Sequence, residues 1–160
     1  GMLHAVDADV EGSGTGGTEL FAYVPSFLFF GPTAPAIDGL AALADPGYSH
    51  RYYVNASPTV ADVDFGRTGG RQEAADWRTV LVSGLGKGGR GFFAIDVTDP
   101  SAFASEGGAA GKVLWEFTDP DMGFSLGLPQ VAKTARWGWV VLLTSGYNNT
   151  PRDGMGGWLY

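Results

Sequence analysis

Three glycines in the stretch VSGLGKGGRGFFAID, residues 82–96, have the spacing Gly84-x-Gly86-x-x-Gly89 with which dinucleotide-binding folds hold a pyrophosphate. That chemistry requires a helix directly after the glycines, because the amides and dipole at the helix N-terminus receive the phosphate. The residues that follow, FFAIDVTDP, are instead aromatic and β-branched and stop at a Thr-Asp-Pro turn signal. Since WRTVLVS before the glycines is equally strand-like, the pattern predicts a hairpin between two strands rather than a phosphate site.

An acidic run, Asp7-Ala8-Asp9-Val10-Glu11-Gly12, begins like a calcium-binding loop, in which alternate oxygens and a glycine at the sixth position wrap the ion. The twelfth position, where such a loop has a bidentate carboxylate, is Thr18, and Glu19 comes one residue late. No helical sequence flanks the run. The pattern therefore favours a glycine-rich hairpin, and ion binding by Asp7, Asp9 and Glu11 is the alternative.

The remaining candidates for acid–base or metal chemistry are two carboxylates and two histidines. Asp62 and Asp64 would share one face of a strand as a paired-carboxylate site, but strand ends beside glycine-rich loops also favour aspartate for turns. His4 and His50 are the only histidines, and His50 lies in the aromatic stretch YSHRYY, which favours an ordering hydrogen bond over catalysis. With no cysteine and no Gly-x-Ser-x-Gly elbow, the standard nucleophile arrangements lack parts. We therefore assign no catalytic, cofactor-binding or metal-binding residue.

The composition indicates an all-β chain with an acidic surface. The 160 residues carry 10 Lys and Arg against 17 Asp and Glu, a formal charge of -7, which argues against nucleic acid as a partner. An apolar share of 44% suits a packed core, while 26 glycines and 9 prolines indicate frequent turns and few long helices. No apolar run approaches the roughly 20 residues of a membrane span.

The elements that would position these residues recur along the chain. Each repeat is a Pro-led strand, a Trp-led strand that ends in Ser-Gly, a strand that ends in Asp and an aromatic strand. The matching segments are SPTVAD (57–62) with LPQVAK (128–133), WRTVLVSG (77–84) with WVVLLTSG (139–146), LHAVD (3–7) with FFAID (92–96), and ELFAY (19–23) with VLWEF (113–117). Four antiparallel strands per repeat describe a β-propeller blade.

The repeats predict one β-propeller domain over residues 1–160, with a defined division. Residues 1–25 are expected to form the last two strands of a blade, 51–120 a complete blade, and 121–160 the first three strands of the next. Residues 26–50 form an inter-blade insertion with a short helix over Ala36–Ala44, stopped by Asp45-Pro46-Gly47. Because a propeller ring usually has four to eight blades, we expect this chain to be part of a larger propeller.

The amino-acid sequences of the repeats resemble those of the C-terminal propeller of the PilC/PilY family of type IV pilus assembly proteins. The strings GMLHAVDA, ELFAYVPSFL, YSHRYYVNASPTVADV, WRTVLVSGLGKGGRGFFAIDVTDP, VLWEFTD and SGYNN carry the resemblance in order across nearly the whole chain. It implies a secreted, outer-membrane or pilus-associated bacterial protein that promotes pilus assembly, opposes retraction and contributes to adhesion and surface sensing. The implied partners are pilins or minor pilins and a host or abiotic surface.

Two departures limit what the resemblance transfers. The family's calcium loop lies beyond the strand that holds SGYNN, and this chain ends before that position, so no calcium ligand is assigned to Asp7 or Asp153. Asn55-Ala56-Ser57 stands where the family usually has Asp-Gly-Ser. The family propeller is similar to that of quinoprotein alcohol dehydrogenases, so one alternative is a dehydrogenase with a quinone and calcium over the propeller axis. A generic repeat-type interaction module is the other alternative.

Overall fold

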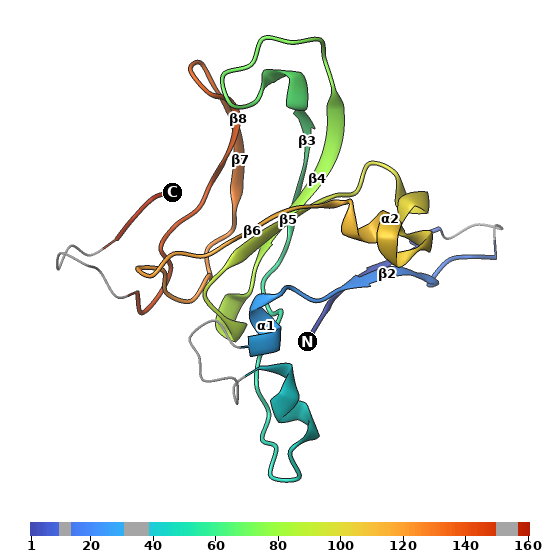
Figure 1. Ribbon diagram of the computed structural model, residues 1–160, viewed down its shortest axis with the longest axis vertical. Coiled ribbons are helices and arrows are strands. Elements are labelled where there is room, and N and C mark those ends of the chain that lie inside the picture. Colours follow the sequence, from blue (N-terminus) through green and yellow to red (C-terminus); the bar gives the residue numbers. More distant parts are fainter. Residues whose placement is uncertain (10–13, 31–38, 150–156) are drawn as a thin grey trace.

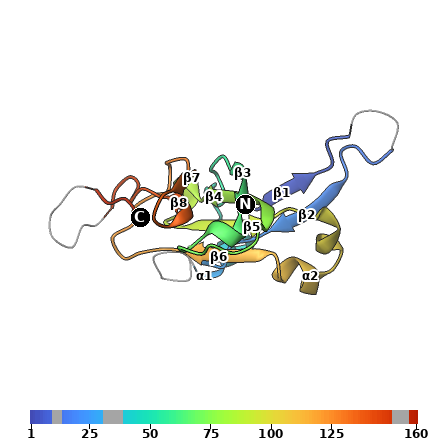
Figure 2. The ribbon, with the colours of Figure 1, turned by 90° about the horizontal axis from the view of Figure 1, so that it is seen from above.

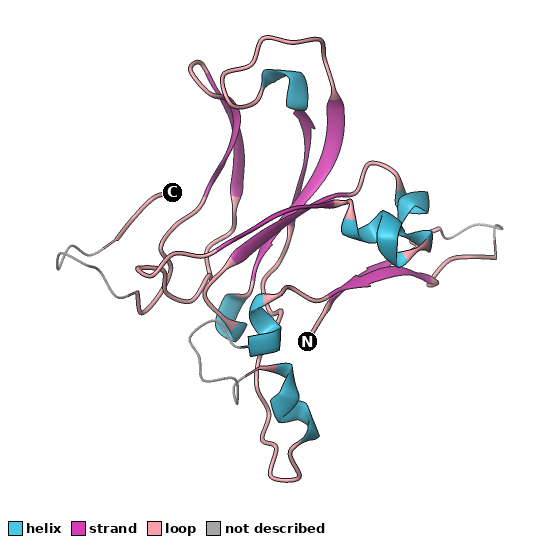
Figure 3. Cartoon of the chain, viewed as in Figure 1, coloured by secondary structure: helices cyan, strands magenta, loops and turns pink. Residues whose placement is uncertain are grey.

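A computed structural model describes residues 1–9, 14–30, 39–149 and 157–160, and it is built from antiparallel sheets (Figures 1 and 3). The central sheet has four strands in the order β3-β4-β5-β6, flanked by the two-stranded sheets β1-β2 and β7-β8. The strands are β1 (Leu3–Val6), β2 (Glu19–Tyr23), β3 (Thr59–Asp64), β4 (Trp77–Gly84), β5 (Phe92–Asp96), β6 (Val113–Phe117), β7 (Gln130–Thr134) and β8 (Gly138–Leu142). The all-β prediction is confirmed.

The helices are short and lie in the connections. They are α1 (Phe27–Phe30), α2 (Glu106–Ala110) and the 3-10 turns η2 (Leu40–Ala44), η3 (Phe65–Arg67), η4 (Gly86–Gly88) and η5 (Pro100–Ala104). Of the helix predicted over Ala36–Ala44, the described part is η2, and residues 36–38 lie outside the described residues. The pair η5 and α2 forms because the Asp99 side chain accepts from the Ser101 amide and Ser105 accepts from the Gly108 amide, at Ncap positions.

The hairpins β1-β2 and β5-β6 have the same register, including the same irregularity. Leu3 pairs with Tyr23 as Phe92 pairs with Phe117, and in each hairpin the pairing shifts after an alanine, between Ala5 and Val6 or between Ala94 and Ile95. The amides that follow donate equivalent 2.8 Å hydrogen bonds, from Asp7 to the Thr18 carbonyl and from Asp96 to the Lys112 carbonyl. The repeat seen in the sequence is therefore a repeat of backbone geometry.

The second pair of matching segments also forms hairpins, but with a register offset of two residues. Val60 pairs with Leu81, whereas the corresponding Val131 pairs with Val141 rather than Leu143. An even offset keeps every side chain on its original face, because side chains in a strand alternate with period two. The cause is the connection: β3 and β4 are joined by residues 65–76, whereas β7 and β8 are joined by residues 135–137.

Residues 157–160 continue the third repeat by pairing with the end of β8. Leu143 and Tyr160 exchange hydrogen bonds of 3.0 and 2.7 Å, and the Ser145 amide donates to the Trp158 carbonyl at 2.8 Å. In the central sheet, Leu81 opposes Ile95 and Ser83 opposes Phe93 in the same way. The third repeat thus contains β7, β8 and a short third pairing within the residues that the structure describes.

Both faces of the central sheet are covered by a neighbouring sheet, as Figure 2 shows from above. Phe93, Ile95 and Leu85 pack with Leu28 and Tyr53 on the side of β1-β2, whereas Val63, Val80, Val82 and Ala94 pack toward Val131, Trp139 and Val141 of β7-β8. The strongest burial is in β5, where Phe93 and Ala94 are fully buried on opposite faces. Such two-sided burial explains why FFAID is a nearly continuous apolar run rather than an alternating one.

Candidate functional site

The glycine-rich segment between β4 and β5 is a hairpin connection. Its middle is the turn η4, and the strand β5 follows at Phe92, which confirms the predicted hairpin. Gly86 has φ +61°, a conformation that L side chains rarely adopt. A Cβ on Gly88 would lie 1.5 Å from the Tyr53 carbonyl oxygen, so the connection packs directly against the chain that enters β3. The glycines serve this close backbone approach.

Ser125 organises that hairpin from a distant part of the chain. Its Oγ accepts from the Leu85 amide at 2.9 Å and donates to the Gly91 carbonyl at 2.8 Å. Its own amide donates to the Gly89 carbonyl, and its carbonyl accepts from Gly86, both at 3.2 Å. Ser125 is fully buried. Sequence reasoning missed this residue, and the only signal was its position just before the Pro-led strand of the next repeat.

Asp7 and Asp9 lie in a turn at the end of β1. The Asp7 carboxylate accepts from the Asp9 amide at 2.9 Å, and the Asp7 carbonyl accepts from Gly17 at 2.7 Å. The hydrogen bonds to the Asp9 amide and the Thr15 side chain hold the pKa of Asp7 below its usual value. Glu11 lies outside the described residues. The described residues contain no group of three or more His, Cys, Asp or Glu side chains that could hold a metal ion.

Asp96, the counterpart of Asp7, is a buried carboxylate, at 5% exposure. Its Oδ1 accepts from the amide and hydroxyl of Thr98, and its Oδ2 lies 3.6 Å from Lys112 Nζ and 3.7 Å from an Arg78 nitrogen. Burial acts to raise the pKa of Asp96, but the Thr98 hydrogen bonds and the two cations outweigh it, and the net pKa is lowered.

The paired-carboxylate candidates are engaged separately. Asp64 is buried, and its Oδ1 accepts from the Gly66 amide at 3.0 Å and the Asp76 amide at 2.8 Å, which closes the turn after β3. Asp62 is exposed and accepts from the Thr79 hydroxyl at 2.7 Å. Asp64 therefore has the turn role that the sequence favours, and each carboxylate has its own set of partners.

The two histidines also contact different neighbours. His4 on β1 places Nδ1 2.7 Å from a carboxylate oxygen of Glu19 on β2, with both side chains about half exposed. The His50 ring packs edge-on against Tyr52 with a centroid separation of 5.1 Å, at the entry to the central sheet. His4 thus pairs across one hairpin, whereas His50 packs within the aromatic stretch that contains it.

Glu116 on β6 joins the central sheet to the preceding one. Its carboxylate accepts from the Tyr23 hydroxyl at 2.5 Å, from the Ser26 amide at 2.7 Å and from the Ser26 hydroxyl. Burial and the negative charge of Glu116 raise the pKa of Tyr23 well above its usual value. Sequence reasoning did not single out Glu116, although it is the polar residue within an otherwise apolar strand, VLWEF.

A cavity of about 550 Å³ lies between the central sheet and β7-β8. Its lining is mainly apolar and includes Val63, Val80, Trp115, Phe117 and Trp139. The Glu116 carboxylate is engaged elsewhere, by Tyr23 and Ser26 on the side of β1-β2. Such a lining suits packing between blades rather than the polarisation of a reacting group.

The family model of the PilY1 beta-propeller domain matches residues 1–156. This chain belongs to the PilY1 β-propeller family. Type IV pilus biogenesis factor PilY1 from Pseudomonas aeruginosa (strain PAO1) is 37% identical over 152 residues, which are 93% of this chain and 11% of that protein. A PilY1 homologue from Xylella fastidiosa (strain Temecula1) is 38% identical over 153 residues, which are 94% of this chain and 8% of that protein.

The crystal structure of the Pseudomonas aeruginosa PilY1 C-terminal domain has the same fold. It matches with a TM-score of 0.59 and 35% identity, covering 93% of this chain and 23% of the crystallised chain. The resemblance to the PilC/PilY family and the β-propeller fold are thereby confirmed. This PilY1-family chain spans about a tenth of the length of the curated relatives that it matches. No helix among the described residues is long and apolar enough to cross a membrane.

Proposed function

We propose that this chain is a non-catalytic propeller segment of a type IV pilus biogenesis factor, which supports pilus assembly, counteracts retraction and mediates surface attachment. The observation that carries the proposal is the match of the PilY1 β-propeller family to residues 1–156, with curated relatives that are named type IV pilus biogenesis factors. We place the protein outside the cell or at the outer membrane and pilus, with pilins or minor pilins and a host or abiotic surface as partners.

The use of the buried and half-buried polar groups supports a scaffold. Ser125 orders a hairpin, Asp64 closes a turn, Asp96 fixes the end of β5, and Glu116 ties one sheet to the next. Each of these groups is engaged in backbone or inter-sheet bonds of the kind that hold a fold rigid. A rigid scaffold leaves the connections at the two ends of the sheets to carry the contacts with partners.

The experiment disrupts the fold of this segment within the complete protein, by adding one methyl group where the backbone leaves no room for it. Gly88→Ala places a Cβ 1.5 Å from the Tyr53 carbonyl oxygen, whereas Gly107→Ala places a Cβ with nothing within 4 Å. We expect cells with Gly88→Ala to lose surface pili, and cells with Gly107→Ala to keep them, at matched amounts of the protein. Normal piliation with a demonstrably disrupted propeller would refute the proposal.

Assembly and retraction are separated by repeating the comparison in cells whose pilus retraction is disabled. Recovery of pili by the Gly88→Ala strain in that background would assign the propeller to the opposition of retraction, whereas persistent loss would assign it to assembly. Attachment is then measured with the piliated, retraction-disabled cells. Attachment equal to that of the unsubstituted strain would remove adhesion from the proposed role.

A further inference from the structure

The connection between β3 and β4 lies against the turn between β7 and β8, at the upper end of the view in Figure 1. The Gly70 amide donates to the Trp137 carbonyl at 3.1 Å, and Thr68 forms bridges with Gly138 and Trp139. A Cβ on Gly138 would lie 1.4 Å from the Arg67 carbonyl oxygen, so the two connections are in backbone contact. They form one continuous end surface.

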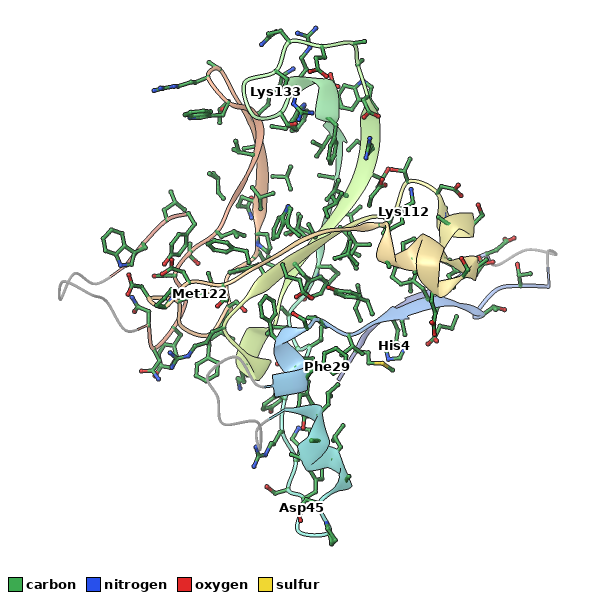
Figure 4. The ribbon with its side chains drawn as sticks, in the orientation of Figure 1. His4, Phe29, Asp45, Lys112, Met122 and Lys133 are labelled. Carbon is green, nitrogen blue, oxygen red and sulfur yellow. The ribbon has the colours of Figure 1, made fainter. Side chains whose placement is uncertain are left out.

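Basic residues gather at this end of an acidic chain. Segments 65–78 and 133–138 contain five of the ten Lys and Arg residues and two acidic residues, Glu73 and Asp76, in a chain whose formal charge is -7. Two buried carboxylates border these segments, Asp64 on the amides of the β3-β4 connection and Asp96 near Arg78, which leaves Arg67, Arg71, Lys133 and Arg136 as the basic residues counted for this surface. Asp76 is paired with Arg78 at 2.7 Å. Figure 4 shows Lys133 where the two connections meet. A local excess of positive charge attracts an anionic partner and speeds its encounter.

The same end exposes tryptophan. Trp77 is 58% exposed and Trp137 is 53% exposed. Trp77 packs edge-on against Trp139, with centroids 6.0 Å apart, and Lys133 lies over the Trp139 ring, so these residues are contiguous. We call the following set the aromatic–basic surface: Arg67, Arg71, Trp77, Lys133, Arg136 and Trp137.

The ring contacts distinguish between kinds of anionic partner. The Arg136 guanidinium lies 4.8 Å from the centre of the Trp137 ring, and Lys133 Nζ lies 5.8 Å from the centre of the Trp139 ring. A sugar that stacked on the Trp137 face under Arg136 would have to displace that guanidinium. A guanidinium stacked on an indole keeps the N–H groups of its edge for a carboxylate, which it binds in bidentate geometry.

We propose that the aromatic–basic surface binds an acidic protein segment, whose carboxylates pair with Arg71, Lys133 and Arg136 and whose apolar side chains pack on Trp77 and Trp137. Tryptophan and arginine are enriched among the residues that contribute most to the binding energy of protein interfaces. The inference goes beyond the proposed pilus role and does not depend on it, because it concerns binding that is measured on the purified protein.

The test measures the fluorescence anisotropy of a labelled peptide of Glu-Glu-Leu repeats with the complete purified protein. We expect binding that weakens as salt is raised, that is weaker for Glu-Glu-Ser repeats and that is absent for Lys-Lys-Leu repeats. The double variant Arg136→Gln/Trp137→Ala should lower the affinity about tenfold. Arg71→Gln alone should lower it by a smaller factor, through an exposed side chain that leaves the backbone contacts unchanged.

The matched control is a second exposed cation–aromatic pair on a different connection. Lys87 lies over the Tyr52 ring at 5.4 Å, and both residues are exposed. Lys87→Gln/Tyr52→Ala removes the same kinds of group and should leave the affinity unchanged. The proposal would be overturned if Glu-Glu-Leu repeats did not bind or if this control lost as much affinity as the double variant. It would also be overturned if alginate, a polyuronate, bound more tightly than the peptide, and that result would assign the surface to an anionic glycan.

Discussion

Ser125 Oγ lies 2.9 Å from the amide nitrogen of Leu85, forty positions away in the chain, and both residues are fully buried. The bond joins the connection that follows the central sheet to the hairpin between β4 and β5. Because the same hydroxyl also donates to the Gly91 carbonyl, one side chain satisfies polar groups at both ends of the glycine-rich connection.

Replacing Ser125 by Ala should leave the buried Leu85 amide and Gly91 carbonyl without this partner. Because an unsatisfied buried polar group costs about 1–3 kcal/mol, we expect the free energy of unfolding to fall by that amount. Chemical denaturation of the purified protein measures it. Ser57→Ala, at an exposed serine, is the control and should change the free energy by less than about 0.5 kcal/mol. Equal effects of the two changes would contradict the role given to Ser125.

Replacing Phe93 by Ala should open a cavity in the packing between the central sheet and β1-β2. Phe93 is fully buried, and such a truncation costs about 3–5 kcal/mol. Phe29→Ala removes the same side chain at 52% exposure and should cost much less. The comparison is tested by the midpoints of thermal unfolding of the two variants. Similar midpoints would contradict the assignment of Phe93 to the packed core.

Asp96 should make folding sensitive to acid. Its pKa is lower in the folded chain than the ordinary 3.8, so its stabilising contribution is fully present above that value and is lost as the pH falls through the folded pKa. Asp96→Asn should therefore lower stability at neutral pH and reduce the loss of stability on acidification below about pH 4. Thermal unfolding as a function of pH measures both effects. If Asp96→Asn lost as much stability on acidification as the unsubstituted protein, Asp96 would not contribute to the acid sensitivity of folding.

Tyr23 and Glu116 should be energetically coupled across the two sheets that they join. Tyr23→Phe and Glu116→Gln, alone and combined, form a double-mutant cycle, and residues in one hydrogen-bonded pair give coupling energies of about 0.5–3 kcal/mol. The free energies of unfolding of the four proteins provide the value. Tyr147→Phe, at a tyrosine that is 71% exposed, replaces Tyr23→Phe in the control cycle and should be additive with Glu116→Gln. Additivity in both cycles would show that the 2.5 Å contact contributes nothing measurable.

The sequence alone predicts the strands of the repeats well, because the matching apolar segments and turn residues reflect local preferences for strand and turn conformations. It also predicts that Gly84 and its neighbours turn a hairpin, since an aromatic and β-branched strand follows them. It did not reveal Ser125 or Glu116, because their partners Leu85 and Tyr23 become neighbours only after the sheets have packed. The helix α2 was missed for a different, local reason, because EGGAA has low helix propensity and depends on the cap at Ser105.

The two-residue difference in register between β3-β4 and β7-β8 could not be predicted from the alignment of the repeats either. Aligning Trp77 with Trp139 and Pro58 with Pro129 fixes which strands correspond, but the length of the connection sets which residues face each other. Registers of hairpins follow the geometry of their turns, and the two connections differ greatly in length.

The matching shifts in pairing after Ala5 and after Ala94 bear on how the repeats of this chain arose. A bulge is a local irregularity in the pairing of two strands, and the two hairpins have theirs at matching positions although they belong to different sheets. Its recurrence is what duplication of an ancestral unit would leave, since copying transmits an irregularity as faithfully as a strand. A chimera that carries residues 92–117 in place of 3–23 would keep the same strand register and the same shift in pairing.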